Sequence, residues 1–395
     1  MRKDFMFASE SMTEGHPDKL CDQVSDAILD RFLRQDPFSR VIAECAVSNG
    51  ILFIASRFSS RGTVDIPDVA RQVINQVGYD REEFNAQTCT VMTSLTELPA
   101  RPADFVDEQD LSDEEVERIT ARNMVNAFGF ACNQTPSMLP LPIWLAHKLA
   151  RRLSLVRLQK RLPYLAPDGK TQVGVEYRGG RPQRIHSITI VASQWGNEAA
   201  NLATLREGLC ESVIQPVFMD EPIRPDEKTS VFINPEGTFF TGGPTLHSGL
   251  TGRKNAVDTY GEYSRQSEAA LSGKDPTRID RVGAYAARYA AKNVVAAGIA
   301  EECEIQLTYI IGQARPASIQ VDTRGTGKIA DDEIAGQLRR HFEFRPAGII
   351  RDFQLRHLPA SFRGGFFRRL AAYGHVGRTD IGLPWERTDK THLLG

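Results

Sequence analysis

The sequence predicts an α+β fold of three pseudo-symmetric domains, each formed by a helix, a β-hairpin and a second helix. Two observations lead to this fold class. One pattern of amphipathic helix, β-branched strand pair and amphipathic helix occurs three times along the 395 residues. The copies are spaced too far apart for a solenoid repeat, which favours a triplicated domain.

The first copy begins with a helix expected over 17–34, where apolar residues recur on one face and Pro17 suits the first helical turn. A hairpin is expected over 40–58, because β-branched residues flank an Asn-Gly turn signal. A second amphipathic helix is expected over 66–78. The other two copies keep this order of helix, strands and helix, at 141–158, 172–194 and 205–217, and at 278–298, 303–324 and 331–344.

Acidic, proline-rich stretches at 99–113 and 218–228 have the composition of linkers. They suggest an N-terminal domain over 1–100, a central domain over 114–230 and a C-terminal domain over 231–395.

The composition is that of an ordinary globular protein, with 41% hydrophobic residues, 25% charged residues and a formal net charge of -2. This balance gives no reason to expect nucleic acid or an anionic membrane as a partner. No apolar run approaches a membrane span, and no secretory signal is recognisable. A cytoplasmic enzyme is therefore the expectation.

The glycine-rich loop over 232–254 ends on Arg253 and Lys254, and such a loop lets backbone N–H groups and bases approach an anion. The segment 271–281 adds further bases and acids before a helix. Asp168 and Lys170 are expected in a tight turn. Each stretch also has a plain interpretation, as a solvated loop or a surface turn.

Together these loops could surround a polyphosphate with bases and hold divalent cations with carboxylates. Neither a Walker-type phosphate loop nor the protein-kinase motifs occur in the sequence. The opening stretch Gly15-His16-Pro17-Asp18-Lys19 could belong to the same site, or could simply mark the start of a helix.

Several motifs, in order, make the chain resemble the S-adenosylmethionine synthetase (methionine adenosyltransferase) family. The resemblance extends from Ser9 to about Lys390 and rests on GHPDK, FINPEG, GLTGRK, SGKDP, GAYAARYAAKN, AAYGHVGR and LPWERTDK. It implies three pseudo-symmetric α+β domains and active sites shared between the subunits of a homodimer, which could pair into a tetramer. It also implies ATP as substrate, with Mg²⁺ and K⁺ as cofactors.

In that family the sulfur of methionine attacks C5′ of ATP, and the tripolyphosphate leaves and is hydrolysed. By resemblance, His16 would assist this departure and Phe239 would stack on adenine. Asp168 matches the nucleotide loop. The bases that would neutralise the phosphates are Lys170, Arg253, Lys254 and Lys274, with Arg278 in place of a family lysine. The metal-holding acids would be Asp18 and Asp280 for magnesium and Glu44 for potassium.

The departures from the family pattern gather where ordinary members hold methionine. Arg57 and Asn123 stand where a glutamate and an aspartate are expected, and Leu98 stands near an expected glutamine. His247 replaces an aspartate before GLTGRK. These changes remove partners of an ammonium group and add a cation, so an anionic acceptor would fit better, unless Arg57 points to solvent.

Three functions remain open at this stage. The first is an adenosyltransferase that makes S-adenosylmethionine, or a close sulfonium analogue, from methionine or a related thioether. The second is a paralogue that keeps the ATP chemistry but serves a different nucleophile. The third is a non-catalytic partner subunit of an active synthetase, which the retained bases and acids disfavour.

Overall fold

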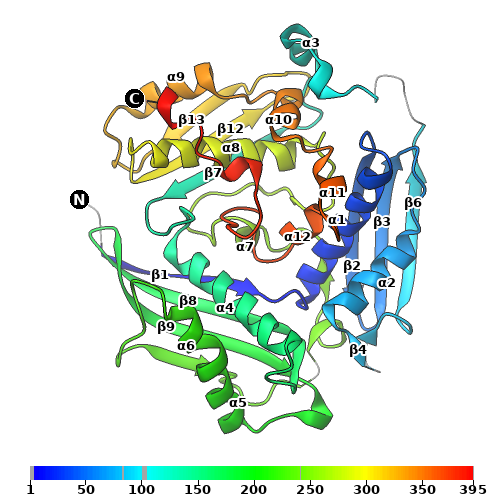
Figure 1. The fold of residues 1–395 in the computed structure, drawn as a ribbon, viewed down its shortest axis with the longest axis vertical. Helices are drawn as coiled ribbons and strands as arrows, with labels where there is room; N and C mark the ends of the chain where they lie inside the picture. The colour runs from blue at the N-terminus through cyan, green and yellow to red at the C-terminus, as the bar shows by residue number, and fades with distance from the viewer. Residues whose placement is uncertain (1–3, 82–83, 100–104, 241, 395) are drawn as a thin grey trace.

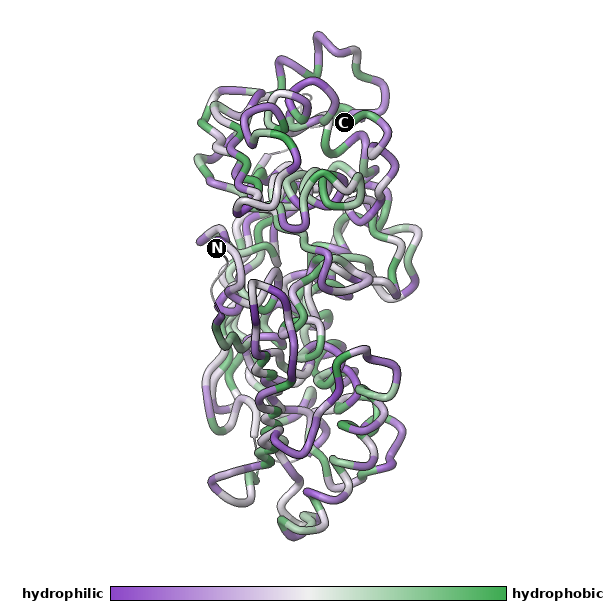
Figure 2. The backbone as a smooth tube through the Cα atoms, turned by 90° about the vertical axis from the view of Figure 1, so that its left-hand side faces the viewer, coloured by the Kyte–Doolittle hydropathy of each residue, from purple (hydrophilic) through white to green (hydrophobic). Residues whose placement is uncertain are grey.

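In a computed structural model that describes residues 4–81, 84–99, 105–240 and 242–394, the chain forms three helix-covered sheets. The α7 and α12 helices, Asn255–Asp258 and Phe367–Leu370, lie between the three layers (Figure 1). The molecule is thin when it is seen from the side (Figure 2). The predicted α+β fold class is confirmed.

The first sheet has the strand order β11-β2-β3-β6. Its central hairpin joins β2 (Arg40–Ser48) and β3 (Ile51–Ser59) through Asn49 and Gly50, whose φ angles are 44° and 80°. Positive φ at both positions is what the Asn-Gly signal predicts. The outer strands are β6 (Thr90–Glu97) and β11 (Gly249–Leu250), and the covering helices are α1 (Pro17–Gln35) and α2 (Ile66–Val77).

The second sheet has the order β1-β8-β9-β10. Its strands are β1 (Phe5–Met12), β8 (Leu165–Arg178), β9 (Arg181–Gln194) and β10 (Ser230–Ile233). The α4 helix, Leu141–Leu158, packs on β1 and β8. The predicted helix over 205–217 is instead a broken one, made of α5 (Leu202–Leu209), a π-helix (Cys210–Ile214) and α6 (Gln215–Phe218).

The third sheet has the order β13-β12-β7. Its strands are β7 (Val125–Cys132), β12 (Glu302–Tyr309) and β13 (Ser318–Asp322), and its helices are α8 (Ile279–Ala296) and α9 (Asp331–His341). Smaller elements are β4 (Asp80–Arg81), β5 (Phe84–Asn85), α3 (Asp113–Arg118), α10 (Pro346–Phe353), α11 (Leu358–Ser361) and short 3₁₀ turns at 108–110, 196–198, 243–245, 384–386 and 391–393.

Each sheet recruits a strand from outside its own sequence repeat. The N-terminal β1 pairs with β8, β7 pairs with β12, and β11 pairs with β2. Each sheet therefore contains strands from more than one of the expected domains 1–100, 114–230 and 231–395. The domain boundaries themselves stay a prediction. Residues 100–104 of the first expected linker lie outside the described residues.

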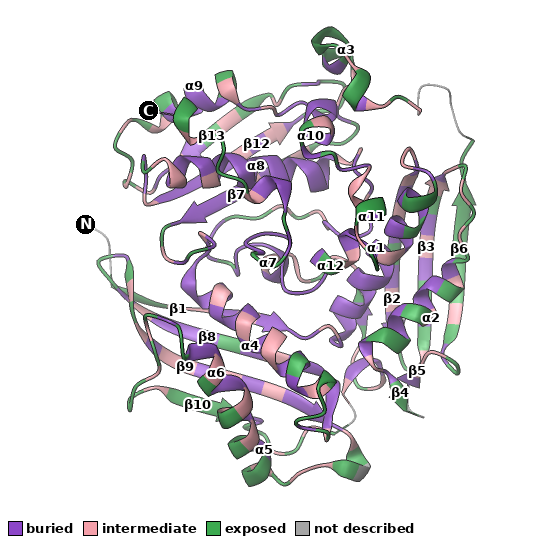
Figure 3. Cartoon of the chain, in the orientation of Figure 1, coloured by how far each residue is buried: buried purple, intermediate pink, exposed green. Residues whose placement is uncertain are grey.

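The α1 helix is buried on most sides, and its buried residues include five charged ones, Asp18, Lys19, Asp22, Asp26 and Asp30 (Figure 3). It lies between the first sheet and the segments that carry α7 and α12, so its polar side chains must find partners inside the protein. Lys19 forms ion pairs with Asp22 at 2.8 Å and with Asp258 at 2.5 Å. This buried network fixes the start of α1, where the candidate site lies.

Among the described residues, no helix is long and apolar enough to cross a membrane.

Candidate active site

His16 is the N-cap of α1, directly before Pro17 in the first turn. The backbone N–H of Asp18 donates to Nδ1 of His16 at 3.2 Å, which leaves the ring proton on Nε2. Burial lowers the pKa of His16 to about 2, and the charges of His247, Lys254 and Lys170 act in the same direction. His16 is therefore a neutral hydrogen-bond donor at physiological pH.

Asp168 lies in β8 and not in the expected tight turn. The pairing of β8 with β9 is irregular between Leu165 and Gly169, and this irregularity accommodates the turn-like sequence within a strand. The Asp168 carboxylate is buried and accepts the N–H of Gly243 at 2.8 Å. It also lies 2.9 Å from Nε2 of His247.

The predicted phosphate-binding bases surround this point. Lys170 and Lys254 share the carboxylate of Glu10, at 3.2 and 3.4 Å. Arg253 lies 2.8 Å from Oδ1 of Asp18. We call the set His16, Asp18, Asp168, Lys170, His247, Arg253 and Lys254 the His16 group.

The Asp18 carboxylate fits a cation. Its Oδ1 accepts the N–H of Leu250 at 3.0 Å, whereas its Oδ2 is buried without a hydrogen-bond partner in the described part of the chain. A buried carboxylate oxygen without a donor is a suitable ligand for Mg²⁺. Nitrogen and oxygen atoms of His16, His247 and Asp168 also lie within 4.8 Å of one another, but His16 already uses its free ring nitrogen to accept the N–H of Asp18.

A second group of predicted residues lies before and at the start of α8. Lys274 Nζ is 3.4 Å from Oδ1 of Asp280, which also accepts from Asn123 Nδ2 at 2.8 Å. We call Lys274, Asp280 and Asn123 the Asp280 group. Asn123 thus binds the predicted metal ligand itself.

No hydrogen bond or ion pair joins the two groups within the residues that the structure covers. Both attach to the same edge of β2: Leu250 pairs with Ala46 near one group, and Lys274 pairs with Ile42 near the other. Four strand residues separate these points, about 13 Å along the strand. Residues 266–268 line the cavity beside Arg253 and Lys254 and also the cavity beside Asp280.

Arg57 and Leu98 line a third cavity, of about 280 Å³. Its other walls include Arg40, Arg122 and Arg278, so four guanidinium groups face one space with no acidic residue among the lining side chains. We call it the arginine cavity. Arg278 lies 3.9 Å from Asp275, and neither Arg57 nor Arg122 has an ion-pair partner among the described residues.

Two predicted residues lie apart from these contacts. Glu44 is exposed on β2 and lies on the same face of the first sheet as Arg57, the face away from α1. Phe239 is half-buried and lies close to Gly242, because a Cβ added at that glycine would be 2.9 Å from the Phe239 ring. The next residue, Gly243, is the one whose N–H donates to Asp168. Their assigned roles stay predictions.

Sequence reasoning missed three residues of these sites. Glu10 holds two of the bases, and its signal was the alternation of the first strand, which was not recognised. Arg40 and Arg122 carry no local motif and reach the arginine cavity only through folding.

The chain matches three family models in succession: the S-adenosylmethionine synthetase N-terminal domain over 4–99, the central domain over 118–239 and the C-terminal domain over 241–387. Its relatives include proteins named S-adenosylmethionine synthase. That of Gloeothece citriformis is 49% identical, with 100% of this chain and 97% of the relative covered. That of Trichormus variabilis is 50% identical at the same coverage, and that of Synechococcus elongatus is 48% identical over 100% and 98%. The chain therefore belongs to the S-adenosylmethionine synthetase family.

Proposed function

We propose that this protein is an adenosyltransferase that joins the adenosyl group of ATP to a thioether, as its relatives' names indicate for methionine. The sulfur lone pair forms the bond to C5′ while the C5′–O bond breaks, and the tripolyphosphate takes the electron pair. Water then cleaves the tripolyphosphate to phosphate and pyrophosphate. The arrangement of the His16 group supports this function best.

The His16 group is suited to a departing polyphosphate. Neutral His16 can donate its Nε2 proton in a hydrogen bond to the oxygen that leaves C5′. Lys170, Arg253 and Lys254 are held by carboxylates in the free protein and can turn to the phosphates, where fixed cations stabilise developing charge. Mg²⁺ at Asp18 and Asp280 would neutralise further phosphate charge, and K⁺ would lie near Glu44.

A homodimer would complete the site by bringing the Asp280 group of one subunit to the His16 group of the other. The open face of the first sheet supports this arrangement, because it carries Glu44, Arg57 and several exposed apolar residues. These are Ile51, Phe53, Met92 and Leu250, each 40–51% exposed. Sedimentation of the purified protein tests for the dimer or a pair of dimers, and a monomer at working concentration would contradict it.

The cytoplasmic location also stays a prediction.

The direct test is incubation with ATP, Mg²⁺, K⁺ and methionine, followed by mass spectrometry for S-adenosylmethionine. We expect the substitution His16→Asn to lower kcat about 100- to 1000-fold, as for the loss of a donor to a developing anion. His186→Asn is the matched control, because that histidine is exposed on the second sheet and should leave kcat unchanged. Phosphate release without an adenosylated product would contradict the transfer.

The arginine cavity favours a second candidate, an acceptor other than methionine. Binding an ammonium group beside Arg57 without the two family carboxylates would bring two positive charges together without a counter-charge, which disfavours it. An acceptor with a carboxylate and no ammonium group would instead pair with the guanidinium groups. A comparison of methionine with 3-(methylthio)propionate separates the candidates: faster use of the propionate supports an anionic acceptor.

Restoring the family acids tests the same point from the protein side. We expect the double variant Arg57→Glu/Asn123→Asp to use methionine at least tenfold better than the natural chain. No gain in methionine use by a correctly folded variant would rule out an arginine cavity that selects against methionine.

The third candidate, a non-catalytic partner subunit, predicts neither ATP hydrolysis nor adenosyl transfer by the isolated protein.

A further inference from the structure

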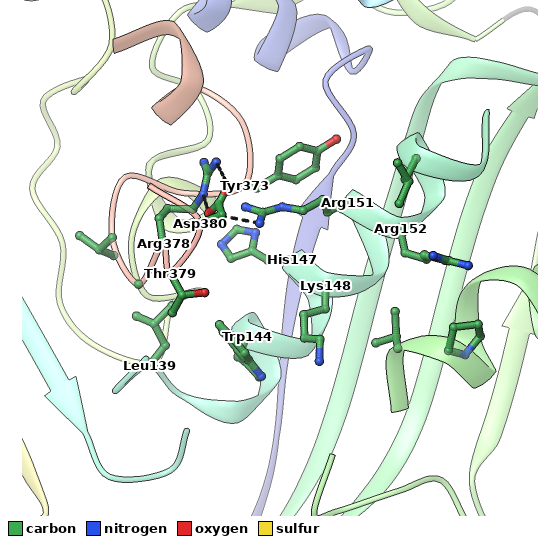
Figure 4. A pocket seen from close by; sticks show the side chains of 15 residues that line it. Leu139, Trp144, His147, Lys148, Arg151, Arg152, Tyr373, Arg378, Thr379 and Asp380 are labelled. Carbon is green, nitrogen blue, oxygen red and sulfur yellow. Dashed lines mark hydrogen bonds and ion pairs between the residues drawn. The ribbon is translucent and has the colours of Figure 1, made fainter. Parts of the chain in front are cut away.

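A separate cavity of about 460 Å³ lies on the outer side of α4, away from every residue discussed above (Figure 4). One stripe of α4 forms its floor, α6 forms one side, and the segment 373–380 forms the other. Figure 4 shows Trp144, Lys148 and Arg151 pointing into it from α4, with Arg378 and Asp380 opposite. We call it the α4 pocket.

The α4 pocket carries an excess of positive charge. Lys148, Arg151, Arg152 and Arg378 line it, and Asp380 is the acid among its lining residues. Asp380 is shared by two guanidinium groups, with Arg378 at 2.8 Å and Arg151 at 3.2 Å. Burial lowers the pKa of Arg151, and the charge of Arg378 lowers it further, so this pair of cations is under-neutralised.

The remaining two cations of the pocket, Lys148 and Arg152, differ in their partners. Lys148 pairs with Glu221 at 2.5 Å, whereas Arg152 donates only to the backbone oxygen of Ser212 within the described residues. The pocket is thus lined by four cations and one carboxylate, and Glu221 pairs with Lys148 from outside the lining. An anion placed beside Arg151 would supply the missing charge.

The rest of the wall is apolar and aromatic. Trp144, Leu155, Val217 and Tyr373 line the pocket beside the charged groups. Leu155 is 39% exposed and adds apolar surface to the wall. A ligand that fits has an apolar or aromatic body and one anionic group.

His147 is a further polar residue of the pocket wall. It is 6% exposed and lines the pocket, and its Nε2 has no hydrogen-bond partner among the described residues. Its Nδ1 lies 2.8 Å from Oγ of Ser11, so a hydroxyl that donates there leaves the ring proton on Nε2.

We propose that the α4 pocket is a binding site for a small organic anion with an aromatic or aliphatic body. The anionic group accepts from Arg151, and Lys148 and Arg152 add attraction at longer range from the same helix. The body lies against Trp144 and Leu155. Tyr373, which lines the pocket, also donates to Glu14, two residues before His16 in the chain. The proposal does not depend on the adenosyltransferase function, because binding is measured without turnover.

The test uses naphthalene-2-sulfonate as the probe and isothermal titration calorimetry on the full chain. We expect saturable binding with a Kd of about 1 mM or tighter, from the ordinary affinity per atom of a ligand of this size. The neutral naphthalene-2-methanol should bind at least tenfold more weakly. Equal affinity for the two probes, or no saturable binding of the sulfonate, would overturn the proposal.

Variants locate the binding. Lys148→Gln/Arg152→Gln should weaken it at least tenfold, and Leu155→Glu should weaken it about fivefold because it adds an acid at the mouth. Leu158→Glu is the matched control, since Leu158 is 56% exposed on the same helix and does not line the pocket. Lys254→Gln controls for binding at the phosphate site. If either control weakens binding as much as the pocket variants do, the site is elsewhere.

Discussion

Substituting Asp26 by asparagine tests the buried ion pair that joins α1 to α8. Arg281 and Asp26 are both fully buried, and Nη2 of Arg281 lies 2.6 and 2.8 Å from the two carboxylate oxygens. The same arginine donates from Nε to the Leu271 oxygen at 2.6 Å. Asp26 also accepts the N–H of Gly273 at 2.8 Å, directly before Lys274 of the Asp280 group.

The expected loss of unfolding free energy follows from the Arg281 charge that Asp26→Asn would leave without its carboxylate partner. Asparagine keeps the shape and one acceptor oxygen, but it leaves the Arg281 cation buried without a counter-charge. Removing one partner of a buried pair costs about 3–5 kcal/mol. We therefore expect Asp26→Asn to lower the free energy of unfolding by that amount. The segment that carries Lys274 is also held less strongly, because Gly273 then donates to a neutral amide oxygen instead of a carboxylate, so kcat should fall with it.

Urea unfolding followed by tryptophan fluorescence is a suitable assay. Trp385 is fully buried and stacks on Tyr285 of α8 with ring centroids 3.8 Å apart, one turn after Arg281. Asp113→Asn is the control, because that aspartate pairs with Arg345 while 80% exposed and should leave the midpoint unchanged. A loss below about 1 kcal/mol in Asp26→Asn, as for a surface pair, would refute the reasoning.

Two further predictions concern stability. His375 is fully buried and its pKa lies well below the usual value through burial, so the unfolded chain binds a proton below pH 6.5 that the folded chain does not. This group should remove about 1.4 kcal/mol of stability per pH unit below that value, and His375→Asn should flatten the slope of unfolding free energy against pH by about one proton. At Gly129 an added Cβ would lie 2.0 Å from the backbone of Ala287, so Gly129→Ala should cost about 1–3 kcal/mol in thermal unfolding, whereas Gly382→Ala, with open space around it, should cost little.

The sequence predicted those parts of the fold that local patterns determine. The first hairpin turns at its Asn-Gly pair, and α1, α4 and α8 lie within a residue or two of their expected ranges. The strands that pair at long range were not predicted. The N-terminal β1 has its partner more than 150 residues away in β8, and no local periodicity of 5–12 reveals that partner.

The candidate site likewise has residues that local motifs predicted and residues that only the folded chain brings together. The motifs predicted His16, Asp168 and the bases near them, and folding brings these together. Asp168 was placed in a turn because its Pro-Asp-Gly sequence is typical of one, whereas pairing with β9 holds it in an irregular strand. The four arginines of one cavity are scattered from residue 40 to residue 278, so only the folded chain shows that they share a space.

The side chains of the His16 group and those of the arginine cavity come from largely different elements. The residues of the cavity can therefore change while those of the His16 group are kept. The His16 group rests on the start of α1, β8 and the segments on both sides of β11. The arginine cavity rests on β2, β3, the segment before Asn123 and the start of α8. Substitutions at Arg57 or Leu98 therefore leave the contacts of His16 and Asp18 in place. The proposed acceptor cavity can thus change its charge while the proposed phosphate site keeps its geometry.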